Sequence, residues 1–189
     1  MKVFDFDNTI YDGECSLDFF KYCLKKKKSL IRYMPMVTAK AMKYKAGFMP
    51  IEEVYAFCEV MLGVFFDNCG DINEIVRGFW KAHEKKLKPF MVQKLTPDDV
   101  IISASPRFLF NGIAGRLNAG SIICTEIDEK NRKIGFLCYS QNKVKAFRES
   151  FGEDAVIDEF YTDNMNDMPL IRLAQKAFLV SGNDISPIA

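Results

Sequence analysis

Histidine is almost absent from this chain, and its cysteines are scattered. His83 is the only histidine among the 189 residues, so there is little basis for a Ser-His-Asp triad around Ser103 or Ser105. The six cysteines, at positions 15, 23, 58, 69, 124 and 138, include no Cys-x-x-Cys pair and no zinc-binding spacing. We therefore interpret the cysteines as reduced, mostly buried thiols, and His83, which lies near Trp80, as a packing or surface residue.

The chain also lacks an excess of charge and a long apolar run. It has 26 lysine and arginine residues against 25 acidic residues, so its overall charge gives no argument for a nucleic-acid partner. No uncharged apolar run approaches the roughly 20 residues that a membrane-spanning helix requires. Near the N-terminus, Asp5, Asp7 and Asp12 interrupt the apolar stretch that a signal peptide would need. We therefore expect a cytoplasmic protein.

Hydrophobic residues make up 49% of the chain, which is enough to bury a core. The segment from Val3 to Phe6 is a short apolar run that ends at polar turn-forming residues, as a buried central strand does. From residue 16 to about residue 87 the apolar residues follow helical spacing. Pro50 and Asp71 mark two helix starts within this region, so we predict three or four helices there.

Strand and helix patterns alternate after residue 98. Strands are predicted at 100–102, 121–126, 134–138, 155–161 and 177–180, and helices at 107–117, at 142–151 and from residue 169. With the first strand, this order predicts an α/β fold: a doubly wound, mainly parallel Rossmann-like sheet with a helical cap inserted after the first strand. We assign residues 1–14 and 88–189 to the catalytic core and residues 15–87 to the cap.

Two carboxylates, Asp5 and Asp7, follow the first predicted strand. Because isolated buried charges are costly, they need either a cation or a chemical role. One carboxylate can attack phosphorus and form an acyl phosphate, while a second protonates the departing oxygen. Ser103 and Asp163 end later strands, and ligands of such sheets bind beyond the carboxyl ends of the strands. The polar residues therefore converge where chemistry is expected.

A bare Asp-x-Asp pair is usually no more than a turn, but three further motifs follow it in order. The string Asp5-Phe6-Asp7-Asn8-Thr9 is followed by Ile102-Ser103-Ala104-Ser105, by Asn142-Lys143-Val144 and by Asp163-Asn164-Met165-Asn166-Asp167. Together they resemble the haloacid dehalogenase (HAD) superfamily, and within it the branch of phosphoserine phosphatase-like enzymes. The resemblance covers essentially the whole chain. Thr162 departs from the pattern, because the family usually has glycine at this position.

The resemblance implies a phosphomonoester hydrolase that acts on a small, phosphoserine-like metabolite through an aspartyl-phosphate intermediate. Asp5 would be the nucleophile. Asp7 would protonate the leaving group and then activate the water that hydrolyses the intermediate. Ser103 and Ala104 would contact the phosphoryl group, and Lys143 would neutralise charge on that group and on Asp5.

The resemblance also implies a magnesium ion. Its ligands would be Asp5, the backbone carbonyl of Asp7, and Asp163, with Asp167 in the first or second shell. Mg²⁺ prefers a few carboxylates together with phosphate oxygens and waters, and phosphoryl transfer depends mainly on positioning and charge neutralisation. These preferences agree with the residue types present.

Glu14 lies nine positions after Asp5, where phosphoserine phosphatases have a glutamate that faces the substrate's amino group. A second interpretation is equally well supported. A negative charge at the start of a helix is favourable by about 0.3–1 kcal/mol, so Glu14 could simply stabilise the next helix. Both interpretations stay open at this point.

The predicted cap contains a basic stretch that begins at Lys25 and runs through Lys28, Arg32, Lys40, Lys43 and Lys45, interleaved with apolar residues. Such a segment can lie on an anionic membrane surface, and it loosely resembles the lids of phosphatidylglycerophosphate phosphatases. We prefer the simpler interpretation of solvated lysines over an apolar helix face. The alternatives are a lipid-phosphate phosphatase, a phosphotransferase, and a catalytically silent binding protein.

Overall fold

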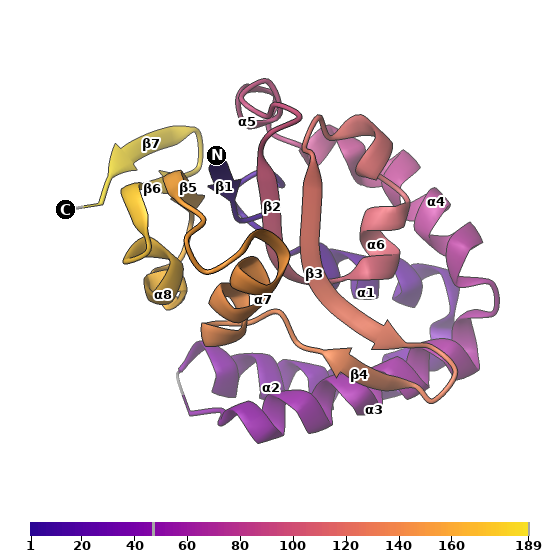
Figure 1. Cartoon of the computed structure of the whole chain (residues 1–189). Coiled ribbons are helices and arrows are strands. Elements are labelled where there is room, and N and C mark those ends of the chain that lie inside the picture. The colour runs from indigo at the N-terminus through magenta and orange to yellow at the C-terminus, as the bar shows by residue number, and fades with distance from the viewer. Residues whose placement is uncertain (47, 189) are drawn as a thin grey trace.

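The computed structural model describes residues 1–46 and 48–188, except for the side chains of residues 41, 44, 45, 51 and 69. The described residues form one seven-stranded sheet in the order β4-β3-β2-β1-β5-β6-β7 (Figure 1). The strands are β1 (Lys2–Phe4), β2 (Val100–Pro106), β3 (Ser121–Asp128), β4 (Lys133–Phe136), β5 (Ile157–Thr162), β6 (Ala174–Ser181) and β7 (Asp184–Pro187). Only the edge strands β4 and β7 pair antiparallel with their neighbours, so the sheet is mainly parallel.

The first strand occupies the centre of the sheet. Val3 of β1 lies opposite Val100 of β2 on one side and Phe160 of β5 on the other. All three side chains are buried, because a strand between two others is covered on both faces. The predicted strand from Val3 to Phe6 is shifted, since the sheet pairing ends at Phe4 and the chain then turns at the polar residues that follow.

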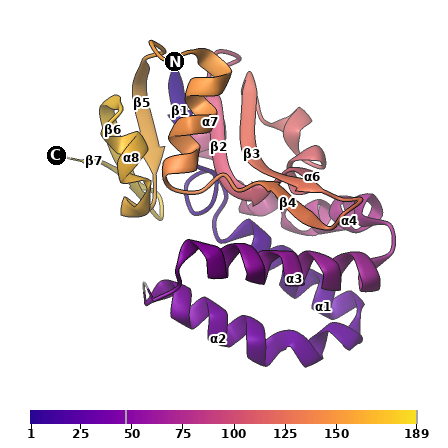
Figure 2. The ribbon, with the colours of Figure 1, turned by 60° about the horizontal axis from the view of Figure 1, so that its bottom comes forward.

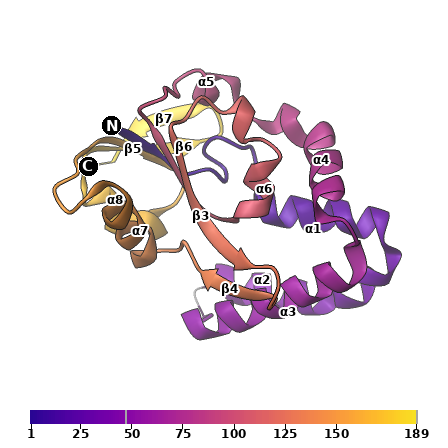
Figure 3. The same ribbon diagram turned by 45° about the vertical axis from the view of Figure 1, so that its right-hand side comes forward.

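The helices are α1 (Cys15–Lys26), α2 (Met34–Lys45), α3 (Ile51–Cys69), α4 (Ile72–His83), α5 (Pro89–Val92), α6 (Arg107–Asn111), α7 (Gln141–Phe151) and α8 (Met168–Ile171). Four short 3₁₀ segments within the described residues are η1 (Lys28–Tyr33), η2 (Glu84–Lys86), η3 (Ala114–Arg116) and η4 (Met165–Asp167). Helices α7 and α8 lie on one side of the sheet, and α4 and α6 lie on the other (Figure 3). The prediction of a doubly wound α/β fold is therefore confirmed.

A hydrophobic cluster lies on each face of the sheet. On the α4 and α6 side, Phe6 packs edge-on against Phe110 and Trp80, with ring centroids 4.9 and 6.3 Å apart. On the α7 and α8 side, Phe147 and Phe160 are fully buried. These aromatic side chains provide much of the apolar surface that drives packing of the helices onto the sheet.

The region between β1 and β2 is helical, as the sequence predicts, and contains α1 to α4. Asp71 begins α4 and accepts hydrogen bonds from the backbone amides of Asn73 and Glu74, at 2.8 and 3.2 Å, which satisfies two amides left unpaired at the helix start. Helices α2 and α3 lie beyond the end of the sheet toward which β1 runs (Figure 2). Among the described residues, no helix is long and apolar enough to span a membrane.

Two predictions of secondary structure are wrong. The helix predicted over 107–117 ends at Asn111 and resumes only as η3. At Gly112 an added Cβ would lie 2.6 Å from Trp80, so the chain passes too close to α4 for a regular helix with side chains. The second error is that strand β7 was not predicted, because its residues are typical of turns. In the structure it is an edge strand that pairs antiparallel with β6.

Candidate active site

The carboxyl ends of the central strands bring the predicted polar residues together. Asp5 follows β1 directly, and its backbone amide donates to the carbonyl of Tyr161 in β5 at 2.8 Å. This bond holds the first residue after β1 against the end of β5. The Asp5 side chain is buried, with 6% of its surface exposed, at the end of the sheet that faces α2 and α3 (Figure 2).

Lys143, in the first turn of α7, is the cation of this cluster. Its Nζ donates to Asp5 Oδ1 at 2.8 Å and to Asp167 Oδ2 at 2.9 Å, and only 4% of the lysine is exposed. Burial disfavours the charged lysine, but Asp5 and Asp167 outweigh it and raise the pKa of Lys143. Burial also raises the pKa of Asp5 well above its usual value; Lys143 opposes this rise, and the charges of Asp167 and Asp7 add to it. One lysine therefore serves two buried carboxylates, Asp5 and Asp167.

The Asp7 side chain has hydrogen-bond partners of its own. Its Oδ1 accepts from the backbone amide of Cys15, at the start of α1, at 2.6 Å, and its Oδ2 accepts from Ser105 Oγ at 2.9 Å. Ser105 Oγ lies 3.0 Å from Ser16 Oγ. Burial raises the pKa of Asp7 to about 7, the Cys15 amide opposes this rise, and Glu14 adds to it. A carboxyl with this pKa can carry a proton near neutral pH, as a general acid must.

The loop after Asp7 is fixed by Asn8 and by a lysine that sequence reasoning missed. Asn8 adopts the left-handed conformation, with φ of 54°, which asparagine tolerates better than most residues. Its side chain donates to Glu14 Oε1 at 3.0 Å and also hydrogen-bonds Asp163. Lys88 Nζ donates to the carbonyls of Asn8 and Gly182. Nothing in the sequence around Lys88 signals this contact with a residue 80 positions away.

Thr162, where the family usually has glycine, orders the loop after β5. Its hydroxyl donates to Asp167 Oδ2 at 2.9 Å and accepts from the backbone amide of Asn164 at 3.1 Å. Asp167 is consequently held by both Thr162 and Lys143. Its carboxylate faces Lys143, so we interpret Asp167 as a residue that positions the lysine.

Ser103, Ala104 and Glu14 occupy different surroundings. Ser103, in β2, is fully buried, and its Oγ accepts from the backbone amide of Ser105 at 3.0 Å. The Ala104 carbonyl accepts from Thr125 Oγ1 at 2.7 Å, while the residue itself is exposed. Glu14 occupies the N-cap position of α1 but makes no side-chain capping bond. Its carboxylate contacts Asn8 instead, and it influences the pKa values of both Asp7 and Asp163.

The carboxylate oxygens of the cluster suit a magnesium ion whose remaining ligands are phosphate oxygens and waters. Among the described residues, no three acidic, histidine or cysteine side chains come close enough to hold a metal alone. Mg²⁺ does not need such a cage, because one or two carboxylates, phosphate oxygens and waters commonly suffice. Burial raises the pKa values of both Asp5 and Asp163, so a nearby cation would favour their ionised forms.

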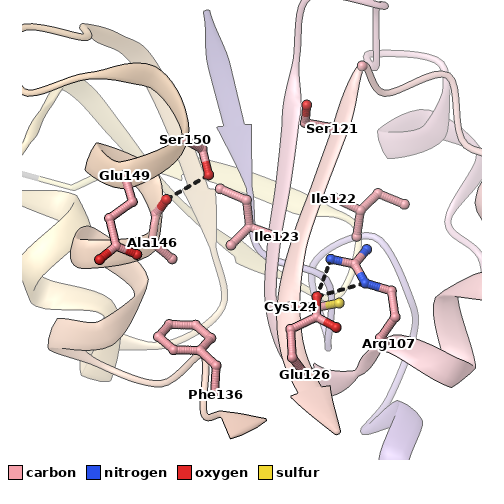
Figure 4. A pocket seen from close by; sticks show the side chains of 11 residues that line it. Arg107, Ser121, Ile122, Ile123, Cys124, Glu126, Phe136, Ala146, Glu149 and Ser150 are labelled. Carbon is pink, nitrogen blue, oxygen red and sulfur yellow. Dashed lines mark hydrogen bonds and ion pairs between the residues drawn. The ribbon is translucent and has the colours of Figure 1, made fainter. Parts of the chain in front are cut away.

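Of two cavities that the described residues form near the sheet, one adjoins this cluster. A cavity of about 500 Å³ lies between β3 and α7 and is lined by Arg107, Cys124, Glu126 and Ser150, among others (Figure 4). Arg107 is paired with Glu126 at 2.6 Å, and none of the predicted site residues lines this cavity. The other, of about 340 Å³, is lined by Glu14, Ser16 and Ala104 and therefore adjoins Asp7.

The comparisons with known proteins agree with this geometry. The family model of the haloacid dehalogenase-like hydrolases matches residues 3–172. The chain therefore belongs to the haloacid dehalogenase-like hydrolase family, and the prediction of an enzyme of this class is confirmed. No curated protein matches the sequence significantly.

Solved structures share the fold at low sequence identity. A protein of unknown function from Bordetella pertussis Tohama I is 16% identical, with a TM-score of 0.77, over 94% of this chain and 87% of that one. A HAD family hydrolase from Salmonella enterica serovar Typhi is 13% identical, with a TM-score of 0.66, over 91% and 59%. A phosphoserine phosphohydrolase-like protein from Francisella tularensis SCHU S4 is 16% identical, with a TM-score of 0.58, over 94% and 86%. At these identities the likeness concerns the fold.

Proposed function

We propose that this chain is a magnesium-dependent phosphomonoester phosphatase that works through an aspartyl phosphate on Asp5. The observation that carries the proposal is the buried Lys143 shared by Asp5 and Asp167 beside a separately bound Asp7. A carboxylate held against a fixed cation is oriented for attack, and the same cation neutralises charge on an incoming phosphoryl group. Family membership and the phosphohydrolase-like fold neighbour support the same reaction class.

The roles of Asp5 and Asp7 differ because their surroundings differ. An oxygen of Asp5 attacks phosphorus, and the bond from phosphorus to the leaving oxygen breaks. Asp7, whose pKa is raised to about 7, gives its proton to that leaving oxygen. Asp7 then accepts a proton from the water that attacks the aspartyl phosphate, which releases inorganic phosphate and restores Asp5.

Other residues bind and orient the phosphoryl group in this proposal. Lys143 contacts its oxygens, and Ser103 and Ala104, within β2, bind it through the hydroxyl and the backbone. Bound magnesium, held by Asp5, the carbonyl of Asp7 and Asp163, would supply charge neutralisation. We assign Asp167 to the support of Lys143.

Residues 15–87 act as a cap in this proposal, and residues 1–14 and 88–189 form the catalytic core. Helices α2 and α3 lie beyond the end of the sheet that carries Asp5 (Figure 2). Water exclusion by such a cap would protect an acyl phosphate from side reactions. Lys86, at the end of this segment, binds Asp18 of α1 and so fastens its two ends together.

The test is release of phosphate from p-nitrophenyl phosphate, phosphoserine and simple alkyl phosphates, with and without Mg²⁺. We expect magnesium-dependent release in the wild type, and loss of at least roughly a thousandfold in Asp5→Asn, because removal of a nucleophile leaves only residual catalysis. Asp12→Asn, an exposed residue of the same loop, serves as the control. Equal activity of Asp5→Asn and wild type would refute the mechanism. Transfer of phosphate to an added alcohol in preference to water would indicate a phosphotransferase.

The surface of the cap supports a second candidate, an enzyme that acts on phosphate carried by a lipid. Ile31, Met42 and Phe48 are 54%, 68% and 75% exposed, and lysines 25–28 are exposed as well. Apolar side chains among lysines suit an anionic membrane surface. Lys40 and Lys43 instead pair with Glu53 of α3, so these two lysines have a structural partner. Tyr44 and Lys45 lie outside the described side chains.

A further inference from the structure

The cavity beside Asp7 is mainly apolar. It has a volume of about 340 Å³ and is enclosed by α1, α3, α6 and the β3–β4 edge of the sheet. Most of its lining comes from aliphatic and aromatic side chains, including Phe20, Phe57, Met61, Leu62 and Phe65. A cavity of this size and composition is in the range that binds small apolar groups.

The polar side chains that line this cavity are few, and most of them are already paired. Ser16 Oγ lies 3.0 Å from Ser105 Oγ, and the Thr125 hydroxyl donates to the Ala104 carbonyl and accepts from the Cys138 amide. None of the described lining residues is a lysine or arginine. The cavity therefore has no cation for a carboxylate such as that of phosphoserine, and Glu14 is its single acidic residue.

Hydrogen bonds through Ser105 join Asp7 to Ser16, which lines this cavity. Asp7 Oδ2 accepts from Ser105 Oγ, which contacts Ser16 at the cavity wall. A general acid must lie within hydrogen-bond distance of the oxygen that it protonates. An alcohol leaving toward Asp7 consequently has its carbon skeleton directed toward the apolar residues behind Ser16.

We propose that the substrate is the phosphate monoester of an apolar alcohol whose hydrocarbon part occupies this cavity. This inference rests on the proposed phosphatase function and specifies its leaving group. At about 30 Å³ for each water-sized group, 340 Å³ accommodates roughly ten methylene-sized groups. Each buried methylene should raise kcat/KM about fourfold, and the rise should stop near a chain of about ten carbons.

The experiment compares ethyl, butyl, octyl and dodecyl phosphate with Mg²⁺ present, each below the concentration at which it forms micelles. We expect kcat/KM to rise steeply from ethyl to octyl phosphate and to level off at dodecyl phosphate. Equal kcat/KM for ethyl and octyl phosphate would overturn the inference while leaving the phosphatase function intact. Absence of hydrolysis of every ester, p-nitrophenyl phosphate included, would overturn both.

A matched pair of variants on α3 separates cavity filling from general damage. Cys58 lines the cavity, whereas Val60 is 52% exposed and lies outside its lining. Cys58→Trp should lower kcat/KM for octyl phosphate about sixteenfold, the effect of displacing roughly two methylenes, and leave ethyl phosphate unchanged. Val60→Trp should change neither. If Cys58→Trp lowers kcat/KM equally for both esters, the result would count against the inference. Unchanged hydrolysis of ethyl phosphate would show that the variant is folded.

The same alcohol chemistry could come from a membrane lipid or from a soluble metabolite. A further arm therefore compares octyl phosphate in solution with phosphatidic acid in phosphatidylcholine vesicles. Preference for the vesicle substrate, weakened by salt, would assign a lipid source. Preference for octyl phosphate would assign a soluble apolar ester, and both results support an apolar leaving group.

Discussion

Replacement of Lys143 by methionine removes the only cation that the described residues place between Asp5 and Asp167. Methionine has a similar length and leaves no large void, so the change is mainly one of charge. Both carboxylates are almost fully buried, at 6% exposure each. The variant therefore retains two buried acids that have lost their shared partner.

The expected loss of stability follows from this burial. Removal of one partner of a buried ion pair typically destabilises a protein by about 3–5 kcal/mol, because a buried charge is left uncompensated. A total stability of about 5–15 kcal/mol is usual, so the variant should still fold. Lys145→Met is the matched control, since Lys145 lies on the same helix and forms only an exposed pair with Glu149 at 3.8 Å. It should cost less than about 1 kcal/mol.

Urea denaturation at several pH values measures the effect and identifies its cause. Burial already raises the pKa of Asp5 in the wild type, and loss of Lys143 should raise it further. A carboxyl with a raised folded-state pKa binds a proton more readily in the folded chain. Stability therefore increases as pH falls from the raised value toward the ordinary value of about 4. The wild-type contribution of Lys143 is constant over this range, because its raised pKa lies far above it.

We therefore expect the stability gap between wild type and Lys143→Met to narrow from pH 8 to pH 5. Asp167→Asn in the Lys143→Met background should recover part of the loss at pH 8, because one buried charge is removed. If Lys143→Met lowers the free energy of unfolding by less than about 1 kcal/mol, with no pH dependence, the two carboxylates are not paired with Lys143 as they are in the structure. A loss of the full size at every pH would indicate disrupted packing.

Three further predictions concern single side chains. Asp7→Asn should slow the release of an alkyl alcohol in the first turnover by about 10²–10⁴-fold. The release of p-nitrophenol should slow far less, because nitrophenolate leaves without a proton. An equal loss of rate for both substrates would show that Asp7 is not the acid. Burial opposes the ionisation of Asp18, but its hydrogen bond from Lys86 helps to lower its pKa. Asp18→Asn should therefore lower the free energy of unfolding by up to about 1 kcal/mol at pH 7. This difference in stability from wild type should disappear as pH falls below the ordinary pKa of about 4. A difference that stays constant with pH would contradict the prediction. Trp80 donates to the buried Leu109 carbonyl at 2.7 Å, and Trp80→Phe should cost about 1–3 kcal/mol in urea denaturation because that carbonyl loses its partner.

Much of the fold follows from local sequence patterns. The short apolar run that ends at Asp5, the helical spacing through the cap and the strand and helix alternation after residue 98 together indicate a doubly wound sheet, and the structure confirms it. Where local signals were mixed, the predictions failed. Turn-forming residues concealed β7, and the early end of α6 depends on the contact of Gly112 with Trp80, a residue of a distant helix.

The sequence by itself determined which residues are candidates for the chemistry, because the order of Asp5, Asp7, Ser103, Lys143 and Asp163 is local information that can be read without the fold. Only the tertiary structure decided how these groups are paired and what surrounds them. Lys88 contacts Asn8 from 80 positions away, and Ser105 contacts Asp7 from 98 positions away. The apolar cavity joins side chains of helices and strands that no periodicity relates. Such contacts arise from the packing of whole elements, and this packing determines what surrounds Asp7.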